Sequence, residues 1–193
     1  MARQLYAVAA HTDPIAGLAA GSTLFSLRWA DAGYSFRLLK LRMGVACTAS
    51  PGSYQDFEIF VARSYTATDT GGVPITTFTR RSLDGQITSR IGDMRIADGA
   101  AITPGTRTLE AHPWTIFAAD FPDKGTPNMP WPPQTISWEA PVAQVAELTS
   151  RPGEGVALAQ DEGIVITVGK AYTPGLSITL WVQMDWTETP LVT

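Results

Sequence analysis

The chain has 193 residues, a formal net charge of −4 and a charged fraction of only 17%. This length suits one well-cored domain, and the acidic balance argues against a protein that binds the phosphate backbone of nucleic acid. The single cysteine, Cys47, excludes an intramolecular disulfide and is expected to be a small buried apolar side chain. No apolar run is long enough to cross a bilayer, so the sequence predicts no membrane segment.

The first 22 residues show no sustained hydrophobic period. They contain small residues, one proline and two glycines, which predicts an extended N-terminal arm over residues 1–22. The apolar start is interrupted from His11 to Pro14, too early for a signal peptide, and this predicts cytosolic synthesis without export.

The next part of the chain alternates between apolar and polar residues, as half-buried strands do. The predicted strands are carried by Phe25, Leu27 and Trp29, by Leu39, Leu41, Met43, Val45 and Cys47, by Phe57, Ile59 and Val61, and by Asp93 to Ala97. Thr79 to Asp84 is either a short helix or a turn. Arg80 and Arg81 open the most basic quarter of the chain, which is either a solvated face or a patch that binds a partner.

Residues 112–141 form the least core-like segment, rich in proline and tryptophan. The prediction is a long, insertion-like loop that carries Trp114, Trp131 and Trp138. Exposed indoles stack on sugars and on protein partners, so these side chains are candidates for a binding surface. The alternative is that they anchor the loop onto its own sheet.

The clearest structural signal lies near the end of the chain. The even positions from Leu176 to Trp186 are all apolar, and only Trp181 breaks the alternation at the odd positions. The β-branched run Gly163 to Val168 comes just before, with turn residues between the two. We therefore predict a long antiparallel hairpin with one face in the core, followed by a C-terminal tail over residues 188–193 that has no partner.

The pattern as a whole contains about eight to ten short strands and no long amphipathic helix. It predicts an all-β chain, an antiparallel β-sandwich or jelly roll, with a single domain over residues 23–187.

No motif for catalysis stands out. The chain has two histidines, His11 and His112, and lacks a nucleophile elbow, a metalloprotease helix or a phosphate loop. A glycosidase-type pair of carboxylates would meet only in the fold, and we expect the candidates to be surface charges. These candidates are Asp120, Asp123, Glu139, Asp161 and Glu162. The sequence predicts a protein that is not an enzyme, with no cofactor and no metal.

Five phrases occur in order along the chain: Asp56–Arg63, Thr68–Gly72, Asp93–Ala97, Ala101–Leu109 and Leu158–Gly163. Together they resemble structural proteins encoded by tailed bacteriophages and prophages. The resemblance covers about residues 35–186, leaves out the Pro/Trp segment 120–138, and carries no assigned site.

The resemblance implies a virion component that decorates or cements a capsid. Its partners would be the major capsid protein, other virion subunits and copies of itself in a homo-oligomer. The alternative is a carbohydrate- or receptor-binding module of a tail fibre or baseplate, with the tryptophans as its contact surface. A hydrolase whose site forms only in the fold is the third hypothesis.

Overall fold

The computed structural model describes residues 4–49, 51–80, 88–123, 156–172 and 174–191, and the regular structure in these ranges is entirely β. The strands are β1 (Gln4–His11), β2 (Ile15–Ala16), β3 (Thr23–Trp29), β4 (Tyr34–Ala49), β5 (Pro51–Arg63), β6 (Val73–Pro74), β7 (Thr79–Arg80), β8 (Ile91–Ile96), β9 (Thr108–Leu109), β10 (Thr115–Asp123), β11 (Ala157–Leu158), β12 (Glu162–Val168) and β13 (Ser177–Pro190).

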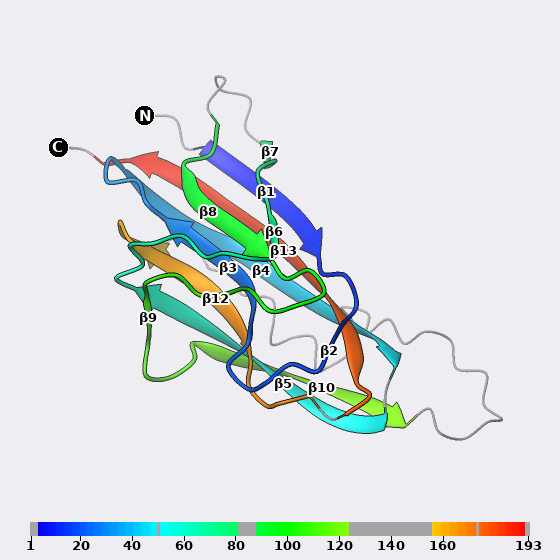
Figure 1. Ribbon diagram of the computed structural model, residues 1–193. Helices are drawn as coiled ribbons and strands as arrows, with labels where there is room; N and C mark the ends of the chain where they lie inside the picture. The colour runs from blue at the N-terminus through cyan, green and yellow to red at the C-terminus, as the bar shows by residue number, and fades with distance from the viewer. Residues whose placement is uncertain (1–3, 50, 81–87, 124–155, 173, 192–193) are drawn as a thin grey trace.

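The strands form two antiparallel sheets that pack against each other, as Figure 1 shows. Sheet A has the order β11-β4-β13-β1-β7, with β2 also paired to β13. Sheet B has the order β10-β5-β12-β3-β8-β6, with β9 also paired to β5. The chain is therefore an all-β sandwich, which confirms the predicted fold class.

The core lies between the sheets and is built from the inward residues of each alternating strand. The predicted apolar face from Leu176 to Trp186 is confirmed, because all six of its side chains are at most 1% exposed. Phe25, Leu27 and Trp29 of β3 are likewise fully buried. At one end of the core Trp186 stacks between Tyr6 and Phe36, with ring centroids 5.6 Å and 6.2 Å away.

The predicted hairpin near the end of the chain is wrong. β12 pairs with β3 and β5 in sheet B, whereas β13 pairs with β4 and β1 in sheet A. The link between β12 and β13 therefore crosses from one sheet to the other. β12 is buried on both faces, with Ile164 and Val165 both at 0% exposure, and such a strand reads as a continuous apolar run. The run identifies a central strand, but it does not say which strands lie beside it.

The expected N-terminal arm is also wrong. Residues 4–11 form β1, which pairs with β13 over its whole length, from Gln4 opposite Glu188 to His11 opposite Trp181. Tyr6 is 2% exposed and lies in the core, as does Ile15 of β2. The sequence analysis did not predict this strand, because alanines occupy much of β1 and make its alternation of apolar and polar residues weak.

The C-terminal tail differs from expectation in the same way. β13 continues to Pro190, and the start of β1 lies beside its last residues (Figure 1). Glu188 is 0% exposed and accepts hydrogen bonds from the indole N–H of Trp186 at 3.0 Å and from the hydroxyl of Ser89 at 2.6 Å. A buried carboxylate with these donors ties this end of β13 to the chain that enters β8.

Two further expectations need correction. Leu39 is only half-buried, because the register of β4 against β13 shifts between Lys40 and Leu38. A bulge of this kind changes the phase of alternation, so Phe36 and Leu38 face the core together with Leu41. The expected loop over residues 112–141 contains strand β10 in its first part. The rest of this loop belongs to residues 124–155, which lie outside the described residues. The side chain of Cys47 also lies outside them, so its expected burial stays a prediction.

The burial of β13 predicts the effect of a truncation. Leu180→Ala is expected to lower the free energy of unfolding by about 2–5 kcal/mol, because a 1%-exposed side chain would leave a cavity between the sheets. Chemical denaturation with a shared slope measures the difference. Gln183→Ala, on the outward face of the same strand, is the control and should change stability by less than about 0.5 kcal/mol. Equal midpoints for the two variants would contradict this assignment of faces.

Candidate interaction surfaces

The outer side of sheet B is partly covered by two loops, residues 64–72 and 101–107. Tyr65 is 0% exposed and forms a small apolar cluster with Ala62 and Val165. A glycine is required beneath it, because a Cβ on Gly163 would lie 2.7 Å from the Tyr65 ring and 2.1 Å from the carbonyl oxygen of Leu27. The close approach of this loop to β12 therefore depends on glycine at position 163.

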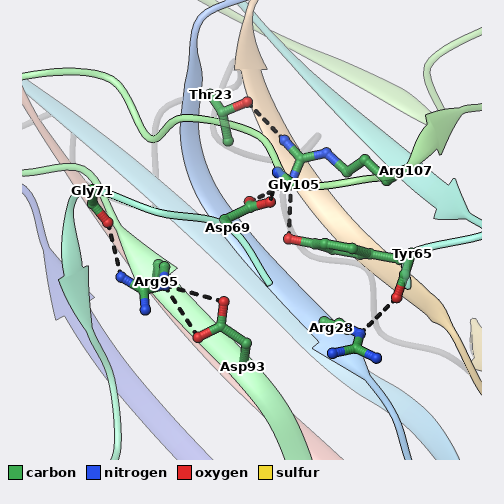
Figure 2. Close-up of polar contacts among 9 residues, drawn as sticks. All are labelled: Thr23, Arg28, Tyr65, Asp69, Gly71, Asp93, Arg95, Gly105 and Arg107. Atoms are coloured by element: carbon green, nitrogen blue, oxygen red, sulfur yellow. Dashed lines mark hydrogen bonds and ion pairs between the residues drawn. The ribbon is translucent and has the colours of Figure 1, made fainter. Parts of the chain in front are cut away.

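A buried ion pair holds the two loops together, as Figure 2 shows. Asp69 is paired with the guanidinium of Arg107, and their side chains are 0% and 4% exposed. Asp69 also accepts the backbone N–H of Gly105 at 2.7 Å, while Arg107 donates to the hydroxyls of Tyr65 at 2.8 Å and Thr23 at 2.9 Å. We call these four side chains, Thr23, Tyr65, Asp69 and Arg107, the loop clamp.

The electrostatics of the loop clamp favour the ion pair. Burial acts to raise the pKa of the Asp69 carboxyl, but the Gly105 N–H, the neighbouring Tyr65 and Ser26 hydroxyls and the Arg107 charge together outweigh it and hold this pKa below its ordinary value. Burial and the neighbouring Asp69 raise the pKa of Tyr65, so its phenol stays protonated. With its members this buried, the loop clamp fastens the loops to the sheet and presents no open site.

The loop clamp was missed by sequence reasoning, which assigned no role to Tyr65, Asp69 or Arg107. One signal was present, because Asp69, Arg107 and Gly163 each belong to one of the five phrases that carried the resemblance. In the structure those phrases meet on the outer side of sheet B. Arg95, from another phrase, bonds Asp93 at 3.1 Å and the Gly71 carbonyl at 3.0 Å (Figure 2).

The outer face of sheet A is different in character. Trp181 is 37% exposed on β13, with Gly44 of β4 opposite it on one side and His11 of β1 on the other. The next outward positions along β13 are Gln183 and Asp185, which lie opposite Arg42 and Lys40. We call the outward residues of β1, β13 and β4 the Trp181 face. Its centre is a partly exposed indole with polar and cationic side chains beside it.

A second exposed surface lies where β10 forms one edge of sheet B. Ile116 is 48% exposed, lies directly opposite Glu58 of β5, and is followed along the same face by Ala118 opposite Asp56. Trp114, just before β10, is 37% exposed. We call Asp56, Glu58, Trp114 and Ile116 the β10 strip. It combines large apolar side chains with two carboxylates.

The structure separates the tryptophans and arginines singled out from the sequence. Trp114 is exposed and belongs to the β10 strip, while Trp131, Trp138 and Arg81 lie outside the described residues. Arg80 lies in β7, opposite Tyr6, and lines an open groove of about 450 Å³ together with Phe78 and Ser89. Arg80 and Trp114 belong to opposite sheets, so the structure does not bring them into one site.

The titratable residues do not assemble into a catalytic site among the residues that the structure describes. His11 ends β1 in sheet A, whereas His112 precedes β10 in sheet B. Asp161 pairs with Arg28 at 3.1 Å, and Glu162 pairs with Arg63, as expected for structural charges. Within the described ranges, no three histidine, cysteine, aspartate or glutamate side chains come together as metal ligands. Glu139 and the side chains of Asp120 and Asp123 fall outside these ranges.

Comparison of the chain with models of protein families and with curated proteins finds no match. None of the described residues belongs to a helix long and apolar enough to cross a membrane.

Proposed function

We propose that this chain is a non-enzymatic structural protein of a tailed-phage virion, a decoration or cement subunit that stabilises the capsid. Its partners are the major capsid protein, other virion subunits and copies of itself. The proposal rests on the five-phrase resemblance and on one structural observation. The large apolar side chains Trp181, Trp114 and Ile116 are exposed in or beside strands of the two sheets, at 37%, 37% and 48%.

Such surfaces suit a protein whose function is to form large interfaces with other subunits. Aromatic side chains supply much of the binding energy at protein interfaces when a partner covers them. The loop clamp is compatible with the same role, because its buried contacts fasten two loops to the outer side of sheet B within a single chain. A low charged fraction of 17% reduces the cost of desolvating a large surface during assembly.

The copy number of the protein in purified particles tests this proposal. Quantitative mass spectrometry of virions should find it in a fixed ratio to the major capsid protein, with many copies per particle. Its removal should lower the temperature at which heads release DNA. A protein absent from particles, or present in only a few copies at the tail, would contradict the decoration role.

The second candidate is the carbohydrate- or receptor-binding module of a tail fibre or baseplate. Trp181 favours it, because a partly exposed indole with polar neighbours such as Gln183 can stack on a sugar ring. Titration of the intact chain with host-surface polysaccharide, monitored by tryptophan fluorescence, tests this candidate. A saturable change that is lost in Trp181→Ala and kept in Trp114→Ala would support it over decoration.

A further inference from the structure

We propose that the edge of β1 from Ala9 to His11 binds an extended polypeptide segment with a lysine or arginine, which pairs with β1 as an additional strand of sheet A. The inference deepens the proposed function and rests on it for the source of the segment, an arm of a neighbouring virion subunit. It is argued from the backbone pairing of β1, from the groove beside this edge and from the charges that line the groove.

One edge of β1 is only partly covered by another strand. On one side β1 pairs with β13 over its whole length, from Gln4 to His11. On the other side β7 pairs with Tyr6 and Ala7 alone, beside the first half of β1 (Figure 1). From Val8 to His11, no strand among the described residues lies along this edge.

The hydrogen-bond pattern shows which backbone groups face the open edge. In an antiparallel pair, successive residues direct their N–H and C=O groups alternately toward the partner strand and away from it. The N–H of Thr12 donates to the carbonyl oxygen of Leu180 at 2.9 Å, and this pair continues the register of β1 against β13. Ala10, two residues before Thr12, therefore also points toward β13. The N–H and C=O groups of Ala9 and His11 point the other way, toward the open edge.

These backbone groups suit a second extended chain. Within the ranges that the structure describes, the backbones of Ala9 and His11 make no hydrogen bond on the open side. The two residues lie about 7 Å apart along the strand, and another strand presents its own donors and acceptors at the same spacing. An open edge of this kind is a template for strand addition.

A groove of about 320 Å³ lies beside this edge. One wall is the end of β1, and the opposite wall includes Val73 of β6, the outermost strand of sheet B on this side, and the neighbouring Ile75. Val73 is 45% exposed, so this wall offers apolar surface to a ligand. A strand added to β1 would direct every second side chain toward this wall, which favours a segment with apolar residues at alternate positions.

The lining of the groove is acidic. Asp13 and Asp98 are exposed there, and no lysine or arginine lines the groove. Neither carboxylate has an ion pair or a hydrogen bond to another residue in the described part of the chain. With His11 counted as neutral, these two carboxylates give the lining a formal charge of −2. A cationic residue in the added strand is complementary to this charge, whereas an acidic one is repelled.

Amide hydrogen exchange of the full chain, measured by NMR with and without a synthetic peptide, tests the proposal. The peptide alternates valine and threonine between two terminal lysines, and its ends are acetylated and amidated. At saturation it should slow exchange at Ala9 and His11 at least about tenfold, because a bound strand accepts hydrogen bonds from both amides. Ala10 is an internal control, since its N–H already points toward β13 and its exchange should not change.

Matched peptides separate the contribution of the backbone from that of the charge. The same peptide with every backbone nitrogen methylated keeps its lysines but donates no hydrogen bond, and it should bind at least about tenfold more weakly. A peptide with terminal glutamates should also bind more weakly than the lysine peptide. This preference should be lost in the Asp13→Asn, Asp98→Asn double variant. It should be kept in Asp56→Asn, a control on β5, which lies away from this edge of sheet B.

A change in the protein backbone gives an independent test. Ala9→Pro removes an N–H that faces the open edge and leaves the hydrogen bonds between β1 and β13 in place, so this variant should bind the lysine peptide at least about tenfold more weakly. Circular dichroism confirms that the variant is folded. If the proline prevents folding, the methylated peptide makes the same test on the wild-type chain.

Three results would overturn the proposal. These are unchanged exchange at Ala9 and His11 up to the solubility limit of the lysine peptide, equal binding of the methylated peptide, and equal binding of the glutamate peptide. Protection of the same amides that increases with protein concentration in the absence of peptide would assign the edge to a second copy instead. Peptide binding tests this edge alone, whereas copy number in particles tests the virion role, so failure of one is distinguishable from failure of the other.

Discussion

Deleting residues 2–20 is expected to abolish folding of the domain. The deletion removes β1 and β2, and with them the core side chains Tyr6, Val8, Ile15 and Leu18, each at most 8% exposed. At about 1.5–3 kcal/mol for each buried side chain, the loss is comparable to the whole stability of a typical domain, about 5–15 kcal/mol. Far-ultraviolet circular dichroism and thermal unfolding of the truncated chain measure the outcome.

A point substitution in the same strand serves as the control. Ala9→Ser lies at an exposed position of β1 and should change the free energy of unfolding by less than about 0.5 kcal/mol. Adding the deleted segment as a synthetic peptide should restore part of the native signal, since β1 pairs with β13 over eight positions. A truncated chain that folds and melts cooperatively without the peptide would show that β1 is dispensable.

Breaking the loop clamp is expected to have the second-largest effect. Asp69→Ala or Arg107→Ala should each lower the free energy of unfolding by about 3–5 kcal/mol, because each leaves the partner charge buried without compensation. The pair is 0% and 4% exposed, so water cannot replace the lost contact. Replacing both residues, as Asp69→Leu with Arg107→Met, should recover much of the loss. A double variant as unstable as the sum of the single variants would contradict a coupled pair.

The same pair predicts a dependence on pH. The pKa of Asp69 is lower in the folded chain than its ordinary value, so the folded state binds a proton at this site less readily than the unfolded state. The stability contributed by the ionised carboxylate is therefore complete above the ordinary pKa and declines as the pH falls through the lowered one. Urea midpoints from neutral pH into the acid range should fall more steeply for the wild type than for the Asp69→Leu, Arg107→Met variant.

Local alternation predicted the strands well wherever large apolar residues mark the buried positions. Phe25, Leu27 and Trp29 in β3 and the even positions of β13 face the core as expected, because a strand exposes alternate residues to opposite sides whatever its neighbours are. The same reasoning identified Trp181 as an exception, and the structure places it on the outer face. Fold class followed from the number of such strands and the absence of helical periodicity.

Alternation predicted less where residues are small or where the period shifts. β1 contains three alanines and one valine, and this pattern is too weak to stand out, although the strand lies between β13 and β7 in sheet A. The bulge at Leu39 reversed the expected face of the residues before it. In both cases the energy that orders the strand comes from its partners, which local sequence does not reveal.

By itself, the sequence of this protein determined the class of the fold and the inward residues of its most regular strands, because side-chain alternation is a local property of an extended backbone. Only the tertiary structure decided that β12 and β13 belong to different sheets, that both ends of the chain pair with each other, and that Asp69 meets Arg107. These outcomes depend on contacts between residues far apart in the chain, and the hydrophobic effect that drives them rewards burial without specifying the partner.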